Sequence, residues 1–210
     1  MAYQQTTNPF YKGNQFLPKA GIKKHAGDYE FDETMKCMDD PCYFAEKYFK
    51  IVHQDAEDGI IPLKLFPYQR ESIERFVETN RLLMATARQV GKTTVATVLI
   101  LWVALFNKRK NIALLADKEA TAIEVLDRIK TAYEYLPDFL KGGVLEWNKK
   151  SVTFENKSKI IASATSSNAI RGKSIFFLYI DEAAHVEDWD TFSAAVLPTV
   201  SASKKSKIVL

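Results

Sequence analysis

The chain reads LLMATARQVGKTT from Leu82 to Thr94. The apolar residues that open this stretch predict a strand, the middle predicts a tight loop, and Gly91-Lys92-Thr93-Thr94 predicts the start of a helix. Backbone N–H groups at a helix N-terminus converge on an anion, and the helix dipole favours negative charge there. The stretch therefore has the layout of a phosphate-binding P-loop, in which Lys92 would reach the β- and γ-phosphates and the Thr93 hydroxyl would ligate Mg²⁺.

The loop departs from the strict pattern G-x-x-x-x-G-K-[ST], because Thr86 stands where the first glycine is expected. Gly-Lys-Thr alone is a weak signal, and an ordinary strand-to-helix turn with a surface lysine is the alternative. The apolar strand before the loop and the apolar helix after it, from Thr93 to Phe106, favour the P-loop. That helix is apolar almost all round, so we expect it to be buried on several sides.

A second motif ends in two adjacent carboxylates, Asp181 and Glu182. The six residues from Ile175 to Ile180 are apolar or aromatic and predict a buried strand. Because ligands of an α/β sheet bind at the carboxyl ends of its strands, Asp181 would hold the Mg²⁺ that Thr93 contacts, and Glu182 would activate the attacking water as a general base. An acidic turn after a buried strand is the alternative. Together with the P-loop, the motif favours an ATPase site that adjoining strands assemble.

Length and composition are those of a globular protein with its own core, at 210 residues, 47% hydrophobic and 26% charged. The formal net charge of +3 is too small to indicate an anionic partner by itself. No apolar run reaches the roughly 18 residues of a membrane span, and the N-terminus lacks the layout of a secretory signal. We therefore expect a cytoplasmic protein with no membrane partner, in which Cys37 and Cys42 are reduced rather than bound to zinc.

Residues 1–38 are predicted to form a flexible N-terminal tail, because they are polar and show no clear periodicity. The basic cluster Lys23-Lys24-His25 could contact nucleic acid, but a solvated tail explains it better. Asp39-Asp40-Pro41 predicts the start of a helix, with Phe44, Tyr48 and Ile51 on one face. We expect this helix to belong to the ATPase domain of residues 39–210 and to pack on the main body of that domain.

Gln69 lies just before an amphipathic helix predicted from Glu71 to Glu78, upstream of the P-loop strand. A glutamine carboxamide can donate to an adenine edge and accept from it at the same time. A polar residue at a helix N-terminus is the alternative, and the rest of the chain favours adenine recognition.

The remaining pattern predicts alternating strands and helices. Ile112–Ala116 reads as a buried parallel strand, and a helical stripe that Asp117 would cap runs from Ala122 to Leu136. Residues 144–154 and 159–164 predict two strands of a hairpin around residues 155–158. The fold class is therefore α/β, a three-layer domain with a mainly parallel sheet, a hairpin and a helical N-terminal segment beside it.

The two motifs also carry a family resemblance. ARQVGKTT at residues 87–94, together with FLYIDEAA at residues 177–184, resembles the ATPase domain of the large terminase of tailed bacteriophages, most closely the T-even type. That family has a deviant P-loop of the form (S/A)-R-Q-x-G-K-T-T, so the departure at Thr86 fits it. DDPCYFA at residues 39–45 and YQR at residues 68–70 also resemble the family's upstream segments, and the resemblance covers roughly residues 38–210.

The resemblance implies a P-loop NTPase fold of the ASCE type with ATP and Mg²⁺ as cofactors. It implies that Gln69 contacts adenine, that Arg88 senses the γ-phosphate in cis, and that Arg171 reaches the neighbouring subunit's site in a ring. Thr93 and Asp181 would serve the metal, and Glu182 would be the catalytic glutamate. The nucleotide-binding residues would be Gln69, Arg88, Gln89, Val90, Gly91, Lys92, Thr93 and Thr94.

The resemblance also implies partners and a setting. The protein would move double-stranded DNA into a preformed capsid, as a homo-oligomeric ring, expected to be a pentamer, with the portal protein and the small terminase subunit. It would work in the host cytoplasm, docked on the procapsid portal. The family's coupling motif and nuclease domain would follow Leu210, so residues 39–210 would be a truncated ATPase domain. A helicase-like translocase, a nucleotide-binding scaffold and a fragment that is inactive alone are the alternatives.

Overall fold

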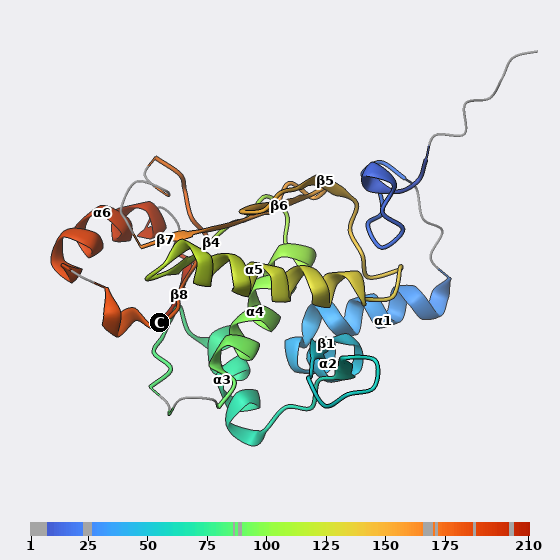
Figure 1. The fold of residues 1–210 in the computed structure, drawn as a ribbon, viewed down its shortest axis with the longest axis horizontal. Helices are drawn as coiled ribbons and strands as arrows, with labels where there is room; N and C mark the ends of the chain where they lie inside the picture. Colours follow the sequence, from blue (N-terminus) through green and yellow to red (C-terminus); the bar gives the residue numbers. More distant parts are fainter. Residues whose placement is uncertain are drawn as a thin grey trace, which may run out of the picture.

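The computed structural model describes residues 8–22, 27–85, 87, 90–165, 170, 172–186, 188–201 and 204–210. A seven-stranded sheet lies at its centre, accompanied by a two-stranded sheet, β1 (Lys50–Val52) and β2 (Ile60–Pro62) (Figure 1). The strands of the larger sheet are β3 (Arg81–Leu82), β4 (Asn111–Ala116), β5 (Val144–Trp147), β6 (Ser151–Phe154), β7 (Lys159–Ala164), β8 (Phe177–Ile180) and β9 (Lys207–Val209). The α-helices are α1 (Asp28–Asp39), α2 (Pro41–Tyr48), α3 (Pro67–Glu78), α4 (Lys92–Phe106), α5 (Glu119–Glu134) and α6 (Trp189–Ser201), and single 3₁₀ turns form η1 (Tyr11–Gly13) and η2 (Ala183–His185).

The order of strands in the large sheet is β3-β9-β8-β4-β7-β6-β5. The pairs from β3 to β7 are parallel, and β6 and β5 join antiparallel. This confirms the predicted α/β fold with a mainly parallel sheet and a hairpin. The expectation that the P-loop strand and the acidic strand adjoin is wrong, because β9 lies between β3 and β8 and pairs with both. The carboxyl ends of these parallel strands still meet at one edge of the sheet.

Two apolar cores on opposite faces of the sheet give the fold its three layers. Alternation along β8 separates them, since Phe177 and Tyr179 belong to the core under α3, α4 and α5, and Leu178 and Ile180 belong to the core under α6. Helix α4 is buried almost throughout, as predicted, and lies with α5 on one side of the strands (Figure 1). Within the described part of the chain, every helix is too short or too polar to span a bilayer.

Lys207 of β9 fixes the end of α3. Its Nζ donates to the carbonyls of Phe76 (2.6 Å), Val77 (3.0 Å) and Thr79 (2.8 Å), which lie at the C-terminal end of the helix, where carbonyls lack helical partners. Burial lowers the pKa of Lys207 below its ordinary value. Because Gln69 lies in the first turn of the same helix, this contact ties that side of the candidate site to β9.

The N-terminal region contains more regular structure than the predicted tail, because α1 occupies residues 28–39. Cys37 of this helix is buried, and its carbonyl accepts from Trp102 Nε1 of α4 at 2.8 Å. Glu33, which is 2% exposed, accepts three hydrogen bonds, from Lys36 Nζ (2.8 Å), Tyr43 OH (2.8 Å) and Tyr48 OH (2.5 Å). A buried carboxylate with polar partners therefore anchors α1, and apolar periodicity cannot reveal such an anchor. The Lys23–His25 cluster lies outside the described residues.

Some predicted boundaries also differ. Helix α2 ends at Tyr48, and the β-branched Ile51 and Val52 pair with β2 instead of continuing a helical face. Helix α3 begins at Pro67, since proline fits the first helical position. Residues 144–154 form two strands, with Asn148 N donating to Ser151 O at 2.8 Å in the turn between them. Lys118, not Asp117, is the N-cap residue of α5.

The Glu33 cluster predicts a pH-dependent stability. Its donors, the Lys36 hydrogen bond first, lower the pKa of Glu33 from 4.5 to about 2. A carboxyl whose pKa is lower in the folded state stabilises the fold above its unfolded pKa, and this contribution is lost as pH falls from 4.5 towards 2. Urea unfolding should therefore show Glu33→Gln less stable than wild type at neutral pH, with the difference shrinking towards pH 2.

Asp32→Asn, on the exposed side of the same helix, is the matched control and should track wild type throughout. A difference between Glu33→Gln and wild type that stays constant down to pH 2 would contradict the role of the ionised carboxylate.

Candidate active site

Gly91 sets the geometry at the start of α4. It is the N-cap residue, with left-handed backbone angles of φ 81° and ψ 28°, which glycine adopts without steric cost. Val95 N donates to Gly91 O at 3.1 Å and closes the first turn. As in any α-helix, the N–H groups of Lys92, Thr93 and Thr94 then have no acceptor within the helix. Together with the positive end of the helix dipole, they form an anion-binding site.

The first turn of α3 holds the loop just before Gly91. Gln69 Nε2 and Tyr68 OH both donate to Val90 O, at 3.2 Å and 2.7 Å, and Gln69 Oε1 accepts from Phe66 N at 3.0 Å. Gln69 is 4% exposed, and a Cβ added at Gly91 would collide with its Nε2. Gly91 is therefore required both for its backbone angles and for the space that Gln69 occupies.

A cavity of about 710 Å³ opens beside Gln69 and Gly91. The rings of Phe66 and Tyr68 stack at its border, 5.7 Å apart and 6° from parallel. Its lining is Ile51, His53, Ile61, Pro62, Leu63, Lys64, Phe66, Tyr68, Gln69, Val90, Gly91 and Thr94. Beyond its contacts with the described residues, the carboxamide of Gln69 has a second N–H and a second lone pair to offer. A mainly apolar cavity with a few polar groups suits a flat heteroaromatic ring.

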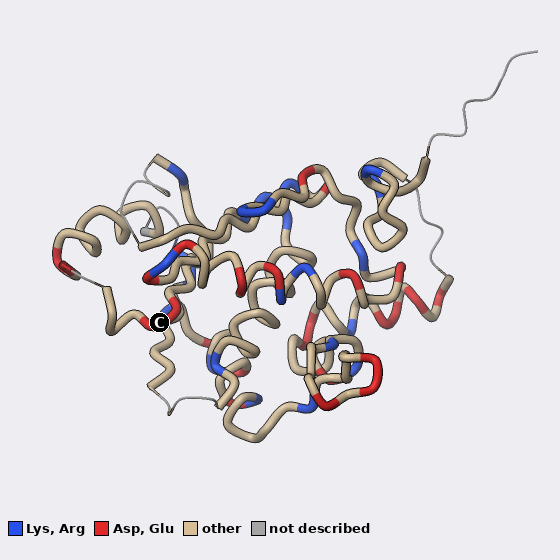
Figure 2. The backbone as a smooth tube through the Cα atoms, viewed as in Figure 1, with Lys and Arg blue, Asp and Glu red and all other residues tan. Residues whose placement is uncertain are grey.

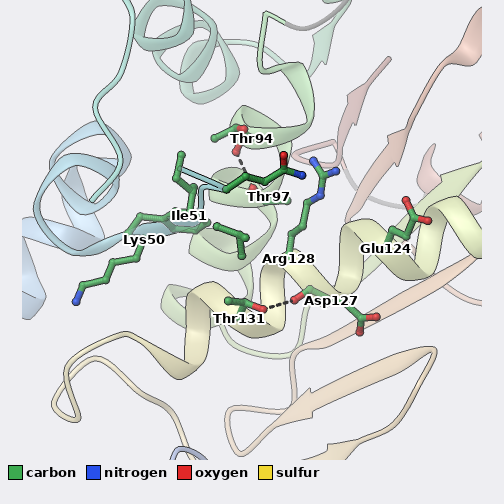
Figure 3. A pocket seen from close by; sticks show the side chains of 11 residues that line it. Lys50, Ile51, Thr94, Thr97, Glu124, Asp127, Arg128 and Thr131 are labelled. Carbon is green, nitrogen blue, oxygen red and sulfur yellow. Dashed lines mark hydrogen bonds between the residues drawn. The ribbon is translucent and has the colours of Figure 1, made fainter. Parts of the chain in front are cut away.

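A second cavity, of about 570 Å³, lies between β1, α4 and α5 (Figure 3). It shares Ile51 and Thr94 with the first cavity, so both open next to the first turn of α4. Figure 3 shows Arg128 extending from α5 towards Thr94 and Thr97. The lining of this cavity is more polar than that of the first, and the guanidinium of Arg128 extends into it from α5.

Tyr179 joins the P-loop helix to the acidic end of β8. Its hydroxyl donates to Asp181 Oδ1 at 2.8 Å, and the Thr93 side chain lies near enough to this hydroxyl to act on its pKa. Burial, followed by the charge of Asp181, raises the pKa of Tyr179 above its ordinary value, so this hydroxyl stays protonated and can donate. Thr93 and Asp181, the two residues predicted to serve a metal ion, thus lie on either side of the Tyr179 hydroxyl.

The backbone turns sharply after Asp181. Asp181 N donates to Leu115 O of β4 at 2.8 Å, which keeps this residue in line with the sheet. Glu182 then takes left-handed angles, φ 51° and ψ 48°, and leads into η2. A residue with a side chain pays about 1–3 kcal/mol for such a conformation, which is concentrated at functional sites. Glu182 is exposed, whereas Asp181 is half-buried, so the two carboxylates face different surroundings.

The structure places most of the predicted site residues around the start of α4. Gln69, Val90, Gly91 and Thr94 line the first cavity. The Tyr179 hydroxyl bonds Asp181 and has the Thr93 side chain nearby. Lys92 is the first residue of α4 and is half-buried. Arg88, Gln89 and Arg171 lie outside the described residues, so their roles stay predictions.

Sequence reasoning missed Tyr179, the contact of Tyr68 with Val90, and Arg128. Strand alternation offered a signal for Tyr179, because a residue two positions before Asp181 faces the same side of the sheet. Tyr68 is adjacent to Gln69 in the sequence, but its hydrogen bond to a carbonyl 22 residues away has no local signature. Arg128 lies on an exposed face of α5, where arginine is ordinary.

These features define a class of protein. An anion site at a helix N-terminus follows strand β3, an acidic pair follows β8, and one strand separates the two in a parallel sheet. This is the arrangement of a P-loop domain that binds nucleoside triphosphates.

The family follows from the sequence. Residues 83–210 match the family model described as terminase large subunit, T4likevirus-type, N-terminal. Because this match covers more than half of the chain, the chain belongs to that family.

Solved structures of large terminases share the fold. The HK97 bacteriophage large terminase superposes with a TM-score of 0.66 at 17% identity, over 82% of this chain and 36% of that one. The ATPase domain of the Thermus phage P74-26 large terminase gives 0.55 at 18% identity, over 66% and 62%. The large terminase of a thermophilic bacteriophage, solved in complex with ADP, gives 0.55 at 12% identity, over 70% and 38%. This chain therefore spans less than two thirds of each of these proteins.

The geometry at Gly91 predicts that Gly91→Ala destabilises the protein. The left-handed conformation costs a residue with a Cβ about 1–2 kcal/mol, and the collision with Gln69 adds to that cost. Urea unfolding should show the loss, and hydrogen exchange should show a less protected start of α4.

Gly142→Ala is the matched control, because a Cβ there meets nothing within 4 Å. It should leave the free energy of unfolding close to that of wild type. Equal stability of Gly91→Ala and Gly142→Ala would contradict the described loop geometry.

Proposed function

We propose that this chain is the ATPase motor part of a viral large terminase, which couples ATP hydrolysis to the movement of double-stranded DNA into a preformed capsid. The observation that carries the proposal is the 2.8 Å hydrogen bond from the Tyr179 hydroxyl to Asp181, with the Thr93 side chain of α4 near the same hydroxyl. It supports a single site formed by the start of α4 and the acidic end of β8. Membership of the terminase family supplies the biological context.

The phosphates would bind at the start of α4. The free N–H groups of Lys92, Thr93 and Thr94 point along the helix axis towards an anion, and the Lys92 ammonium adds a charge. A magnesium ion fits the donors present, because Thr93 and Asp181 offer a hydroxyl and a carboxylate oxygen, the hard ligands that Mg²⁺ prefers. When bound, it would neutralise charge on the β- and γ-phosphates.

The adenine base would occupy the first cavity, which opens beside Gln69 and Gly91. Phe66 and Tyr68 offer apolar ring surface there, and Gln69 has a donor and an acceptor left for an adenine edge. The large terminase of the thermophilic bacteriophage was solved with ADP, which supports a nucleotide at this fold position.

Glu182 would act as the general base that orients or deprotonates the attacking water. Arg88 would stabilise transition-state charge from within the loop, and Arg171 would do so from a neighbouring copy in a ring, expected to be a pentamer. Both arginine roles rest on the family resemblance and on the general value of such residues in NTPases, about 10³–10⁵ in rate.

The partners and the setting follow from the family. The portal protein, the small terminase subunit and double-stranded DNA would be the partners, and the host cytoplasm at the procapsid portal would be the location. Residues 39–210 would form the ATPase domain, with a nuclease domain beyond them. DNA phosphates need only Lys and Arg contacts, and Figure 2 shows Lys and Arg positions spread over the chain. Lys149 and Lys150 lie between β5 and β6, and Lys157 lies between β6 and β7.

Two substitutions test the proposal. Lys92→Ala should abolish binding of a fluorescent ATP analogue, because the phosphates lose their cation. Glu182→Gln should retain that binding and lower ATP turnover by about 10²–10⁴-fold, the range for a lost general base. A phosphate-release assay and a fluorescence titration measure the two effects.

Glu57→Gln, on the exposed loop between β1 and β2, is the control and should leave both properties unchanged. Equal turnover of wild type and Glu182→Gln would refute the role of Glu182. Unchanged ATP binding in Lys92→Ala would refute the phosphate site itself.

A further inference from the structure

Tyr179 is packed between two neighbouring strands beside the candidate site. It lies inside β8, with Leu114 of β4 opposite it on one side and Val209 of β9 opposite it on the other. Tyr179 is 1% exposed and belongs to the same core as Phe177 and Val209. Packing on both sides therefore restricts the position of the hydroxyl that Asp181 accepts from.

The direction of its hydrogen bond to Asp181 follows from the groups involved. A carboxylate oxygen only accepts, so the single Tyr179 proton is used in the 2.8 Å bond to Asp181 Oδ1. The Thr93 side chain lies near the same hydroxyl.

This bond determines what Asp181 can offer to a third group. One carboxylate oxygen is turned to Tyr179, and among the described residues no donor bonds the other oxygen. A carboxylate that is held in one orientation with an oxygen left to accept suits a hydrated or directly bound divalent cation.

We propose that Tyr179 is a positioning residue for the metal ion, which orients Asp181 so that its remaining carboxylate oxygen serves Mg²⁺. The inference rests on the proposed nucleotide site and adds to it a determinant of metal affinity. Tyr179 does not touch the nucleotide in this scheme and acts only through Asp181. Without the tyrosine hydroxyl, Asp181 loses the 2.8 Å hydrogen bond that fixes its orientation, and its carboxylate is free to turn away from the metal.

A buried tyrosine that merely satisfies its own hydroxyl is the competing explanation. It predicts a loss of stability on removal of the hydroxyl and no change in metal binding. Tyr133 provides the matched comparison, since it is also fully buried and its hydroxyl donates to the carbonyl of Gly142, in a different part of the fold.

The test compares Tyr179→Phe and Tyr133→Phe, which both keep the ring and remove only the hydroxyl. Mn²⁺ replaces Mg²⁺ as the probe, and electron paramagnetic resonance measures its affinity for the protein–ADP complex. Loss of a residue that orients metal ligands typically weakens metal binding by about 10–100-fold, so Tyr179→Phe should show a loss in this range. ADP binding in the presence of EDTA should be unchanged, and Tyr133→Phe should match wild type in both measurements.

A second arm tests the coupling to Asp181. In an Asp181→Asn background, the Tyr179→Phe change should have no further effect on Mn²⁺ affinity, because the carboxylate it orients is absent. Unfolding curves of all variants show whether the fold is retained.

An unchanged Mn²⁺ affinity in Tyr179→Phe, or an equal loss in Tyr133→Phe, would overturn the inference while wild type still binds Mn²⁺ and ADP. A wild-type protein that binds neither ADP nor Mn²⁺ would instead overturn the proposed function, and the inference with it.

Discussion

The parallel pairing of β9 with both β3 and β8 is the constraint on which the rest of the structure depends. Ile208 lies opposite Arg81 on one side and Leu178 on the other. The pairing continues towards the P-loop, where Leu210 N donates to Leu82 O at 3.0 Å and Met84 N donates to Leu210 O at 2.9 Å. Buried backbone groups need partners, so residues 207–210 hold the P-loop strand in the sheet and align its end with that of β8.

Three elements then contribute one part each to the site. Helix α3 holds the Val90 carbonyl through Gln69 and Tyr68, helix α4 offers its N-terminus, and β8 brings Asp181. Lys207 binds the far end of α3, so β9 sets the position of this helix as well as of the two strands. Tyr179 of β8 donates to Asp181 and has the Thr93 side chain of α4 close to its hydroxyl, so it lies between the start of that helix and the acidic pair.

Elements that depend on a local sequence pattern were predicted correctly. Features that depend on contacts between residues far apart in the sequence were not. The buried strand before Asp181 and the apolar helix α4 follow from composition and spacing, and both are present. Gly91 stands at the start of that helix, as the motif predicts, whereas residues 86, 88 and 89 of the loop lie outside the described part of the chain. The place of β9 between β3 and β8 is a tertiary choice that no segment encodes alone. Helix α1 was missed because Glu33 anchors it through Tyr43 and Tyr48, and polar contacts leave no apolar stripe. Residues 144–154 were predicted as one strand, but the chain turns after Asn148, whose N–H donates to Ser151 O.

A crystal structure of this protein with Mg²⁺ and ADP tests the central claim most directly, namely that the loop before α4 and the end of β8 form one nucleotide site. The account predicts phosphates on the N–H groups at the start of α4, the metal at Thr93 and Asp181, and the base in the aromatic cavity beside Gln69. A nucleotide bound only in the second cavity, which Arg128 lines, would contradict it. A metal ion remote from both Thr93 and Asp181 would contradict it as well.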